Sequence, residues 1–143
     1  MTFEVVDENI LRYEFNIPEI DNKYINTVKF AFSSDIDEEI YGMGIQNTVW
    51  NFKGHSVPML SAEGGVGRGL EPISTLKGID AGTSTTSYGP ALSYITNKQR
   101  AFVCESTNLG LVNFTASETQ VLYWNARKFT GSIIYGEDFL QLT

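Results

Sequence analysis

The sequence has little of the chemistry that most catalytic and metal-binding sites need. It contains one cysteine, Cys104, and one histidine, His55, in 143 residues. A single cysteine excludes an internal disulfide and a cysteine-rich metal site. A single histidine leaves any catalytic triad to be built around His55 alone, and no serine lies in a G-x-S-x-G motif. We therefore expect no metal, no cofactor and no catalytic residue, and we expect Cys104, in the apolar run 101–104, to be a buried small hydrophobe.

Basic residues and long apolar runs are also scarce. Ten Lys and Arg stand against 17 Asp and Glu, which gives a formal net charge of −7. The basic residues do not cluster, so nucleic acid and anionic membrane surfaces are poor partners for this chain. No stretch approaches the roughly 20 apolar residues of a membrane helix. Residues 1–4 lack the basic and apolar regions of a signal peptide, so none is expected, and the localisation stays open.

Apolar residues at every second position are the main feature that is present. Leu11, Tyr13, Phe15 and Ile17 alternate with polar residues, which is the pattern of a half-buried strand. Similar short segments, separated by turn residues, occur at 28–32, 101–105, 111–116, 120–125 and 131–136. Short strands at this spacing predict an all-β, antiparallel β-sandwich or barrel, formed by residues 1–143 as one domain.

Two of these segments, 121–124 and 133–135, are apolar on both faces. Strands of this kind are usually covered on both sides, because an exposed apolar face is unfavourable. We therefore expect something to pack on each face, and part of that cover could be a domain outside this chain.

The middle of the chain, residues 53–90, has few apolar residues, and seven glycines fall between Gly54 and Gly82. Long loops in compact domains are often functional, although a loosely ordered insertion is the alternative. The GGVGRG run at 64–69 lacks the Gly-Lys-Ser/Thr ending of a phosphate-binding loop, which argues against a nucleotide site. The acidic pairs at 38–39 and 137–138 are expected to be solvated turn residues.

Three segments in this order resemble the N-terminal domain of family 31 glycoside hydrolases. Residues 41–46 (YGMGIQ) resemble the family's Y-G-x-G-E/Q segment. Residues 54–59 (GHSVPM) followed by 61–69 (SAEGGVGRG) are similar to the G-x-x-V-P…S-E-Q-G-x-G-R pattern of α-glucosidase-like enzymes and sulfoquinovosidases. Residues 81–82 (AG) and 85–90 (TTSYGP) look like the family's G-G…T-T-Y-x-P segment.

The resemblance extends to residues 136–142 (GEDFLQL), which look like the family's exit toward its barrel. The departures from the pattern are Ile45-Gln46 in place of the usual Glu, Gly64 in place of Gln, Gly89 in place of a bulkier residue and Phe139 in place of Pro. The agreement in order and spacing is more specific than any single segment.

This resemblance implies a galactose-mutarotase-like β-sandwich (a supersandwich) that precedes a (β/α)8 barrel. Family 31 enzymes are typically retaining α-glycosidases, and retention uses two carboxyl groups roughly 5–5.5 Å apart. A barrel takes about 250 residues, so the catalytic carboxylates must lie outside this chain. The implied function is that of a non-catalytic domain, which packs on a barrel in cis or in a separate chain and lends a loop to the pocket for an α-linked sugar.

By the same resemblance, the loop that reaches the sugar is residues 61–69. Arg68 would donate forked hydrogen bonds to sugar hydroxyls or a barrel carboxylate, and Glu63 would accept from a hydroxyl or hold Arg68. The alternative is that the two side chains only pair with each other or with the barrel surface. Trp50 and Trp124 could stack on a sugar, but core or interdomain packing is expected.

Two other functions remain as alternatives. One is a stand-alone carbohydrate-binding β-sandwich, which would need aromatic side chains exposed on one face or in a groove. The other is a mutarotase that uses His55 and Glu63 as acid and base. The family pattern explains both of these residues better, so a structural role is expected for His55.

Overall fold

The computed structural model describes residues 2–18, 27–45, 49–61, 82–124, 127–138 and 142. These residues form strands and turns, as the alternating pattern predicts. The strands are β1 (Thr2–Asp7), β2 (Ile10–Asn16), β3 (Thr27–Ser33), β4 (Ile40–Ile45), β5 (Ser56–Met59), β6 (Gly89–Thr96), β7 (Arg100–Cys104), β8 (Gly110–Phe114), β9 (Glu118–Trp124) and β10 (Lys128–Tyr135). Within the described residues, no helix has the length and hydrophobicity that a membrane crossing requires.

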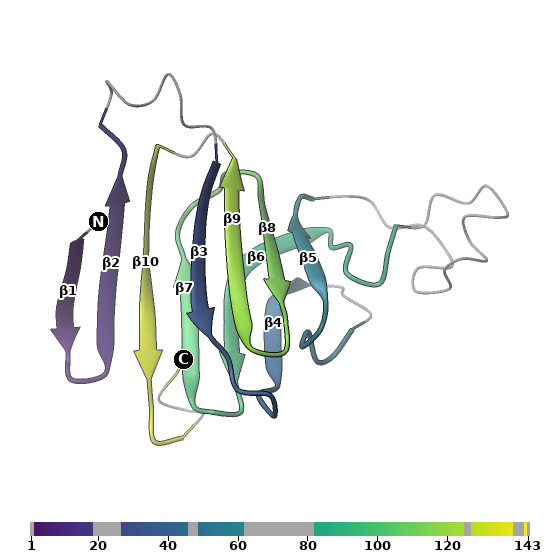
Figure 1. The fold of residues 1–143 in the computed structure, drawn as a ribbon, viewed down its shortest axis with the longest axis horizontal. Coiled ribbons are helices and arrows are strands. Elements are labelled where there is room, and N and C mark those ends of the chain that lie inside the picture. Colours follow the sequence, from purple (N-terminus) through teal and green to yellow (C-terminus); the bar gives the residue numbers. More distant parts are fainter. Residues whose placement is uncertain are drawn as a thin grey trace, which may run out of the picture.

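The strands form two antiparallel sheets packed face to face (Figure 1). The larger sheet has the order β1-β2-β10-β7-β6-β4, and the smaller has the order β3-β9-β8-β5. In Figure 1 the smaller sheet lies in front of the larger one, and β1 and β2 extend beyond its edge. The predicted all-β sandwich is confirmed.

The core lies between the sheets and is rich in aromatic rings. Alternation sends one side chain in two inward from each strand, as Val121 of β9 and Val112 of β8 show by their complete burial. Phe30 of the smaller sheet contacts Phe129 of the larger sheet edge to face, with ring centroids 4.6 Å apart. Cys104 packs against this core but is only partly buried, in contrast to the predicted full burial, and it accepts a hydrogen bond of 2.9 Å from the Tyr123 hydroxyl.

Strand β4 contains a bulge that depends on two glycines. Gly42 and Gly44 have φ of 119° and 100°, and the pairing with β6 shifts register between them. Met43, between them, has φ of 66° and is fully buried. Because a left-handed φ is unfavourable for a residue with a side chain, the bulge places Met43 in the core at a cost in backbone strain.

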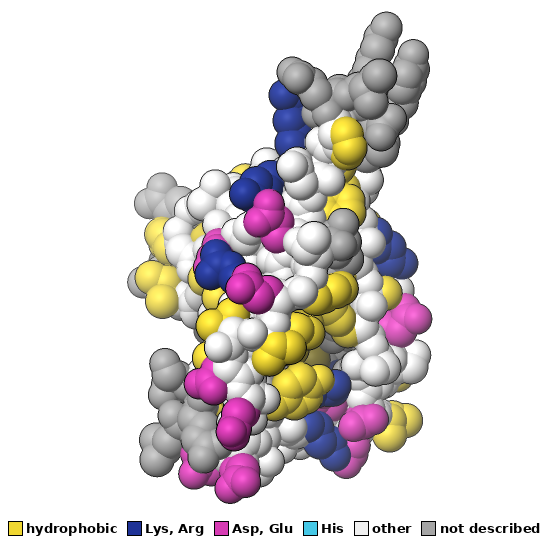
Figure 2. Space-filling model, turned by 90° about the vertical axis from the view of Figure 1, so that its left-hand side faces the viewer, with side chains coloured by type: hydrophobic (Ala, Val, Ile, Leu, Met, Phe, Trp, Pro, Cys, Tyr) yellow, Lys and Arg dark blue, Asp and Glu magenta, His cyan; other side chains and the backbone are white. Residues whose placement is uncertain are grey.

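Strand β1 leaves apolar side chains uncovered at the edge of the larger sheet. Phe3 and Val5 pair with Tyr13 and Leu11 and so share their inward-facing side, yet Phe3 is 56% and Val5 72% exposed. Figure 2 views the molecule from this side and shows hydrophobic side chains gathered along its middle. The smaller sheet therefore covers only part of the larger one.

Candidate functional site

The three segments that resemble the glycoside hydrolase pattern meet at one place. Ser61 forms a parallel bridge with Ser87, and its Oγ donates to the Tyr88 carbonyl at 2.5 Å. Ser87 is 1% exposed, and its Oγ donates to the Ile45 carbonyl at 2.6 Å. Residues 87–88 are thus hydrogen-bonded to Ile45 on one side and to Ser61 on the other, although the three segments lie apart in sequence.

A turn of threonines fixes the chain where it enters β6. The Thr83 amide donates to Thr86 Oγ1 at 2.8 Å, and the Thr86 amide donates back to the Thr83 carbonyl at 3.0 Å. The buried Thr85 donates its hydroxyl to the Ser56 carbonyl at 3.1 Å, which ties the turn to β5. We call Ser61 together with residues 82–88 the loop root, because they flank residues 62–81.

The two predicted sugar-contacting residues, Glu63 and Arg68, lie outside the described residues. The same holds for most of the predicted loop 61–69, of which Ser61 is described. The prediction for Glu63 and Arg68 therefore stays a prediction. The structure places the described end of that loop, at Ser61, against residues 87–88.

His55 and Trp50, two further candidates from the sequence, are not part of the loop root. His55 is half-buried before β5, where its amide donates to the Phe52 carbonyl and its carbonyl accepts from the Phe114 amide. Trp50 is 85% exposed and touches Tyr41 edge to face, with ring centroids 6.2 Å apart. The prediction that Trp50 packs in the core is therefore wrong. Its packing against another domain stays a prediction.

An open cleft of about 680 Å³ lies beside the loop root. It is formed by the end of β5, the start of β6 and the β7–β8 connection. Leu60, Tyr88 and Leu109 line it and are each at least 40% exposed. This end of the sandwich therefore combines a concave surface with exposed apolar side chains.

The outer face of the smaller sheet carries an apolar strip that begins at the same end. Leu122 pairs with Leu111, and Leu111 pairs with Pro58, so these three side chains form a row across β9, β8 and β5. The row faces away from the core, because Val121 and Val112 beside it point inward. We call Pro58, Leu60, Leu109, Leu111, Leu122 and Trp124 the apolar strip.

The strip accounts for the prediction that segment 121–124 is apolar on both faces. Tyr123 and Val121 are buried in the core, whereas Leu122 and Trp124 lie on the outer face. A solvated sheet face normally carries polar residues, and β9 does so at its other end, at Glu118 and Gln120.

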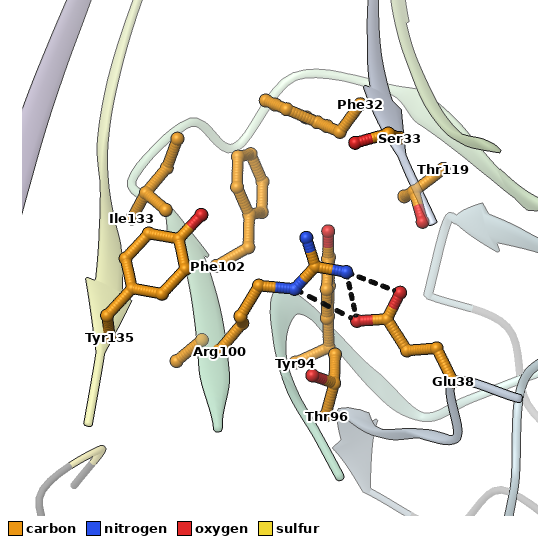
Figure 3. A pocket seen from close by; sticks show the side chains of 11 residues that line it. Phe32, Ser33, Glu38, Tyr94, Thr96, Arg100, Phe102, Thr119, Ile133 and Tyr135 are labelled. Carbon is orange, nitrogen blue, oxygen red and sulfur yellow. Dashed lines mark hydrogen bonds and ion pairs between the residues drawn. The ribbon is translucent and has the colours of Figure 1, made fainter. Parts of the chain in front are cut away.

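A separate, smaller pocket of about 160 Å³ opens between the sheets (Figure 3). Its centre is an ion pair between Arg100 of β7 and Glu38 of the β3–β4 connection. Arg100 Nη2 donates to both carboxylate oxygens at 2.6 Å, and Nε donates to Oε1 at 3.1 Å. The other lining residues are Phe32, Ser33, Tyr94, Thr96, Ala101, Phe102, Thr119, Ile133 and Tyr135.

Glu38 is therefore not the solvated turn residue that the sequence predicts. It is 3% exposed and also accepts a 2.7 Å hydrogen bond from Ser34 Oγ. Burial raises the pKa of Glu38, but hydrogen bonds from Arg100, Ser34 and Thr96 outweigh it and lower the pKa below its ordinary value. The carboxyl is thus held in its charged form, and its neighbour Glu39 stays exposed, as predicted.

Within the part of the chain that the structure describes, no group of three or more His, Cys, Asp or Glu side chains is placed to hold a metal ion. The charged residues instead form pairs, such as Arg12 with Glu105 at 3.1 Å and Lys98 with Asp37 at 2.7 Å. The described residues therefore offer two places for a partner molecule: the loop root with its apolar strip, and the Arg100 pocket.

Comparison with solved structures relates the fold to part of several glycoside hydrolases. A family 31 (GH31) sulfoquinovosidase from E. rectale matches 98% of this chain with a TM-score of 0.79 at 23% identity, and the match covers 21% of that enzyme. A xylosidase from Aspergillus niger matches 87% of this chain with a TM-score of 0.58 at 21% identity. A GH31 dextranase from Flavobacterium johnsoniae matches 98% with a TM-score of 0.55 at 13% identity, and the match covers 14% of each of these two enzymes.

The chain thus has the fold of a domain that these enzymes contain, and it spans about a fifth or less of their length. No protein-family model and no curated protein matches the sequence.

Proposed function

We propose that this chain is the non-catalytic β-sandwich domain of a family 31 glycoside hydrolase that acts on an α-linked sugar. It packs on a (β/α)8 barrel, in cis or in a separate chain, and contributes the loop 61–69 to the sugar pocket. The observation that carries the proposal is the loop root, where the segment 85–90 hydrogen-bonds to Ile45 and to Ser61, each from another segment that resembles the family. The fold shared with a GH31 sulfoquinovosidase supports it.

The apolar strip is the surface that we assign to the barrel. It begins at Leu60, directly before Ser61, so a domain that rests on the strip also lies beside the start of the loop. Leu60 and Leu109 of the strip are exposed and its other members are partly exposed, and contiguous apolar side chains on an outer sheet face are typical of an interface. Trp124 provides the kind of aromatic anchor that contributes most to such interfaces.

In the complete enzyme the barrel supplies the nucleophile and the acid–base carboxyl, and this domain supplies sugar contacts. Arg68 is suited to the contact because its planar guanidinium donates paired hydrogen bonds to neighbouring hydroxyls. Glu63, five residues earlier, accepts from a hydroxyl or orients Arg68. Neither residue forms or breaks a bond in the substrate, so their effect is on binding and orientation.

The first test is to sequence the source gene beyond the codon for Thr143 and to identify proteins that copurify with the chain. We expect an in-frame or separately encoded barrel with two catalytic carboxylates. In that enzyme, Arg68→Ala should lower kcat/KM by about 10- to 100-fold, which corresponds to one or two lost charge-assisted hydrogen bonds. Lys77→Ala, which removes another cation from residues 62–81, should leave kcat/KM within about 3-fold of wild type. A gene with no barrel and no barrel partner would refute the proposal.

A second test concerns the apolar strip. Leu122→Glu places a carboxylate in the middle of the strip beside Lys29, its cross-strand neighbour, so the sandwich itself should stay folded. Interdomain association should weaken by at least about 10-fold, because the new carboxylate, even beside Lys29, would lose its hydration when it is buried against the barrel. Association is measured by titrating the barrel domain with the variant sandwich.

The matched control is Gln120→Glu, on the same face of the same strand and flanked by Ala31 and Asn113. It should leave association near wild type. Equal losses for the two variants would mean that the strip is not the interface.

A further inference from the structure

The Arg100 pocket has the size and lining of a site for one small ring. Its volume of about 160 Å³ is close to that of an engineered cavity of about 150 Å³ that holds benzene. Phe32, Phe102 and Ile133 form apolar walls, and Thr96 and Thr119, the cross-strand partner of Phe32, add polar side chains to the lining (Figure 3). A ligand that fits must therefore present an apolar face and a hydroxylated edge.

The charge in the pocket is balanced within the protein. Glu38 is buried beside Arg100, so the positive and negative charges cancel and the pair presents no net charge to a ligand. The three hydrogen bonds between them use Nε and Nη2 of Arg100. In Figure 3 the guanidinium group points into the pocket and its third nitrogen is directed away from Glu38. An anion would compete with Glu38 for the guanidinium and a cation would face it, so a neutral ligand is favoured.

Tyr135 closes one side of the pocket. It lies directly across from Arg100 in the pairing of β10 with β7, and its side chain is half exposed. A tyrosine at the mouth of a pocket offers a flat face for stacking and a hydroxyl for hydrogen bonding. The entrance therefore offers both an apolar surface and a polar group, as the interior does.

We propose that this pocket binds a single neutral pyranose, with its ring against Ile133 and the half-exposed Tyr135 and its hydroxyls toward Arg100. Pyranoses carry hydroxyls around their edge and C–H groups on their faces, which matches the lining. The pocket uses none of the residues of the loop root or the apolar strip. The proposal therefore goes beyond the catalytic pocket of the proposed enzyme and stands or fails independently of it.

The test is a titration of the ¹⁵N-labelled 143-residue chain with D-glucose and D-xylose, followed by NMR. We expect saturable shifts of the Arg100 Hε and the Phe102 amide signals, with a dissociation constant on the order of 1 mM for a ligand of this size. Tyr135→Ala should weaken binding about 3- to 10-fold, because it removes the aromatic face at the mouth of the pocket. The variant keeps the Glu38–Arg100 pair, and circular dichroism checks that it is folded.

The control is Trp50→Ala, which removes an exposed aromatic that does not line the pocket and should leave binding unchanged. If neither sugar saturated the shifts at about 100 mM, the proposal would be overturned, since binding that weak is not specific recognition by a pocket. Shifts that cluster at Trp50 and Tyr41 would overturn it too. Saturation of the pocket by phenol but not by sugars would assign it to aromatic ligands and likewise reject the pyranose.

Discussion

Replacing Gly44 by alanine is expected to lower the free energy of unfolding by about 4 kcal/mol or more, which is a large part of the stability of an ordinary domain. A Cβ at this position would lie 2.1 Å from the Gly89 carbonyl oxygen and 2.8 Å from the Ala91 amide nitrogen. Both are backbone atoms of β6, so no side-chain rotation can relieve the contact. The φ of 100° adds strain for any residue with a side chain. Urea denaturation followed by circular dichroism measures the effect.

Gly54→Ala is the matched control, because Gly54 also has a left-handed φ, of 83°, but a Cβ there meets nothing within 4 Å. It should cost about 1–2 kcal/mol, the strain of the backbone conformation alone. Equal costs for the two substitutions would show that β4 can move away from β6, and the close approach at Gly44 would then not hold the bulge in place.

The strands with strict alternation could be predicted from the sequence, whereas the irregular ones could not. β2 and β9 follow the alternating pattern, and the structure places them within one or two residues of the predicted ranges. β4 breaks alternation at its bulge, so its buried Met43 does not follow from the pattern of neighbours. β5 is four residues long and contains Pro58, which an edge strand tolerates but a sequence pattern does not reveal.

The error at Glu38 has a physical reason that lies outside local sequence. Adjacent acidic residues normally mark a solvated turn, and Glu39 is indeed exposed. The partner of Glu38 is Arg100, 62 residues further along the chain, and only the packing of the β3–β4 connection against β7 brings them together. The apolar strip, in contrast, left a local signal, because segment 121–124 is apolar on both faces.

Two departures from the family pattern, Ile45 and Gly89, lie opposite each other in the structure. Ile45 and Gly89 are direct partners in the pairing of β4 with β6. A Cβ on Gly89 would lie 3.2 Å from the Ile45 side chain, so a bulkier residue at 89 requires a different arrangement at 45. The contact that Ile45 makes to Ser87 uses its carbonyl, which any residue provides. The departures therefore leave the hydrogen bonds of the loop root unchanged.

Glu38→Gln is expected to lower the free energy of unfolding at pH 7 by about 3 kcal/mol, because it leaves Arg100 without its charged partner in a largely buried site. The substitution should also change the response to acid. The folded pKa of Glu38 lies below its ordinary value of 4.5, since the hydrogen bonds from Arg100, Ser34 and Thr96 outweigh the effect of burial. A carboxyl of this kind stabilises the fold above its unfolded pKa, and that stability is lost as pH falls through the folded pKa.

Wild type should therefore lose stability more steeply than Glu38→Gln as the pH is lowered below about 4.5, and the two curves should converge in strong acid. Thermal or urea unfolding from pH 7 to pH 2.5 measures both curves. Glu39→Gln, next along the chain but exposed, is the control and should follow the wild-type curve. If Glu38→Gln showed the wild-type acid response instead, other carboxylates would dominate it. The main role of the Glu38–Arg100 pair would then be to hold the β3–β4 connection against β7. The charge of Glu38 would contribute little to the stability of the fold.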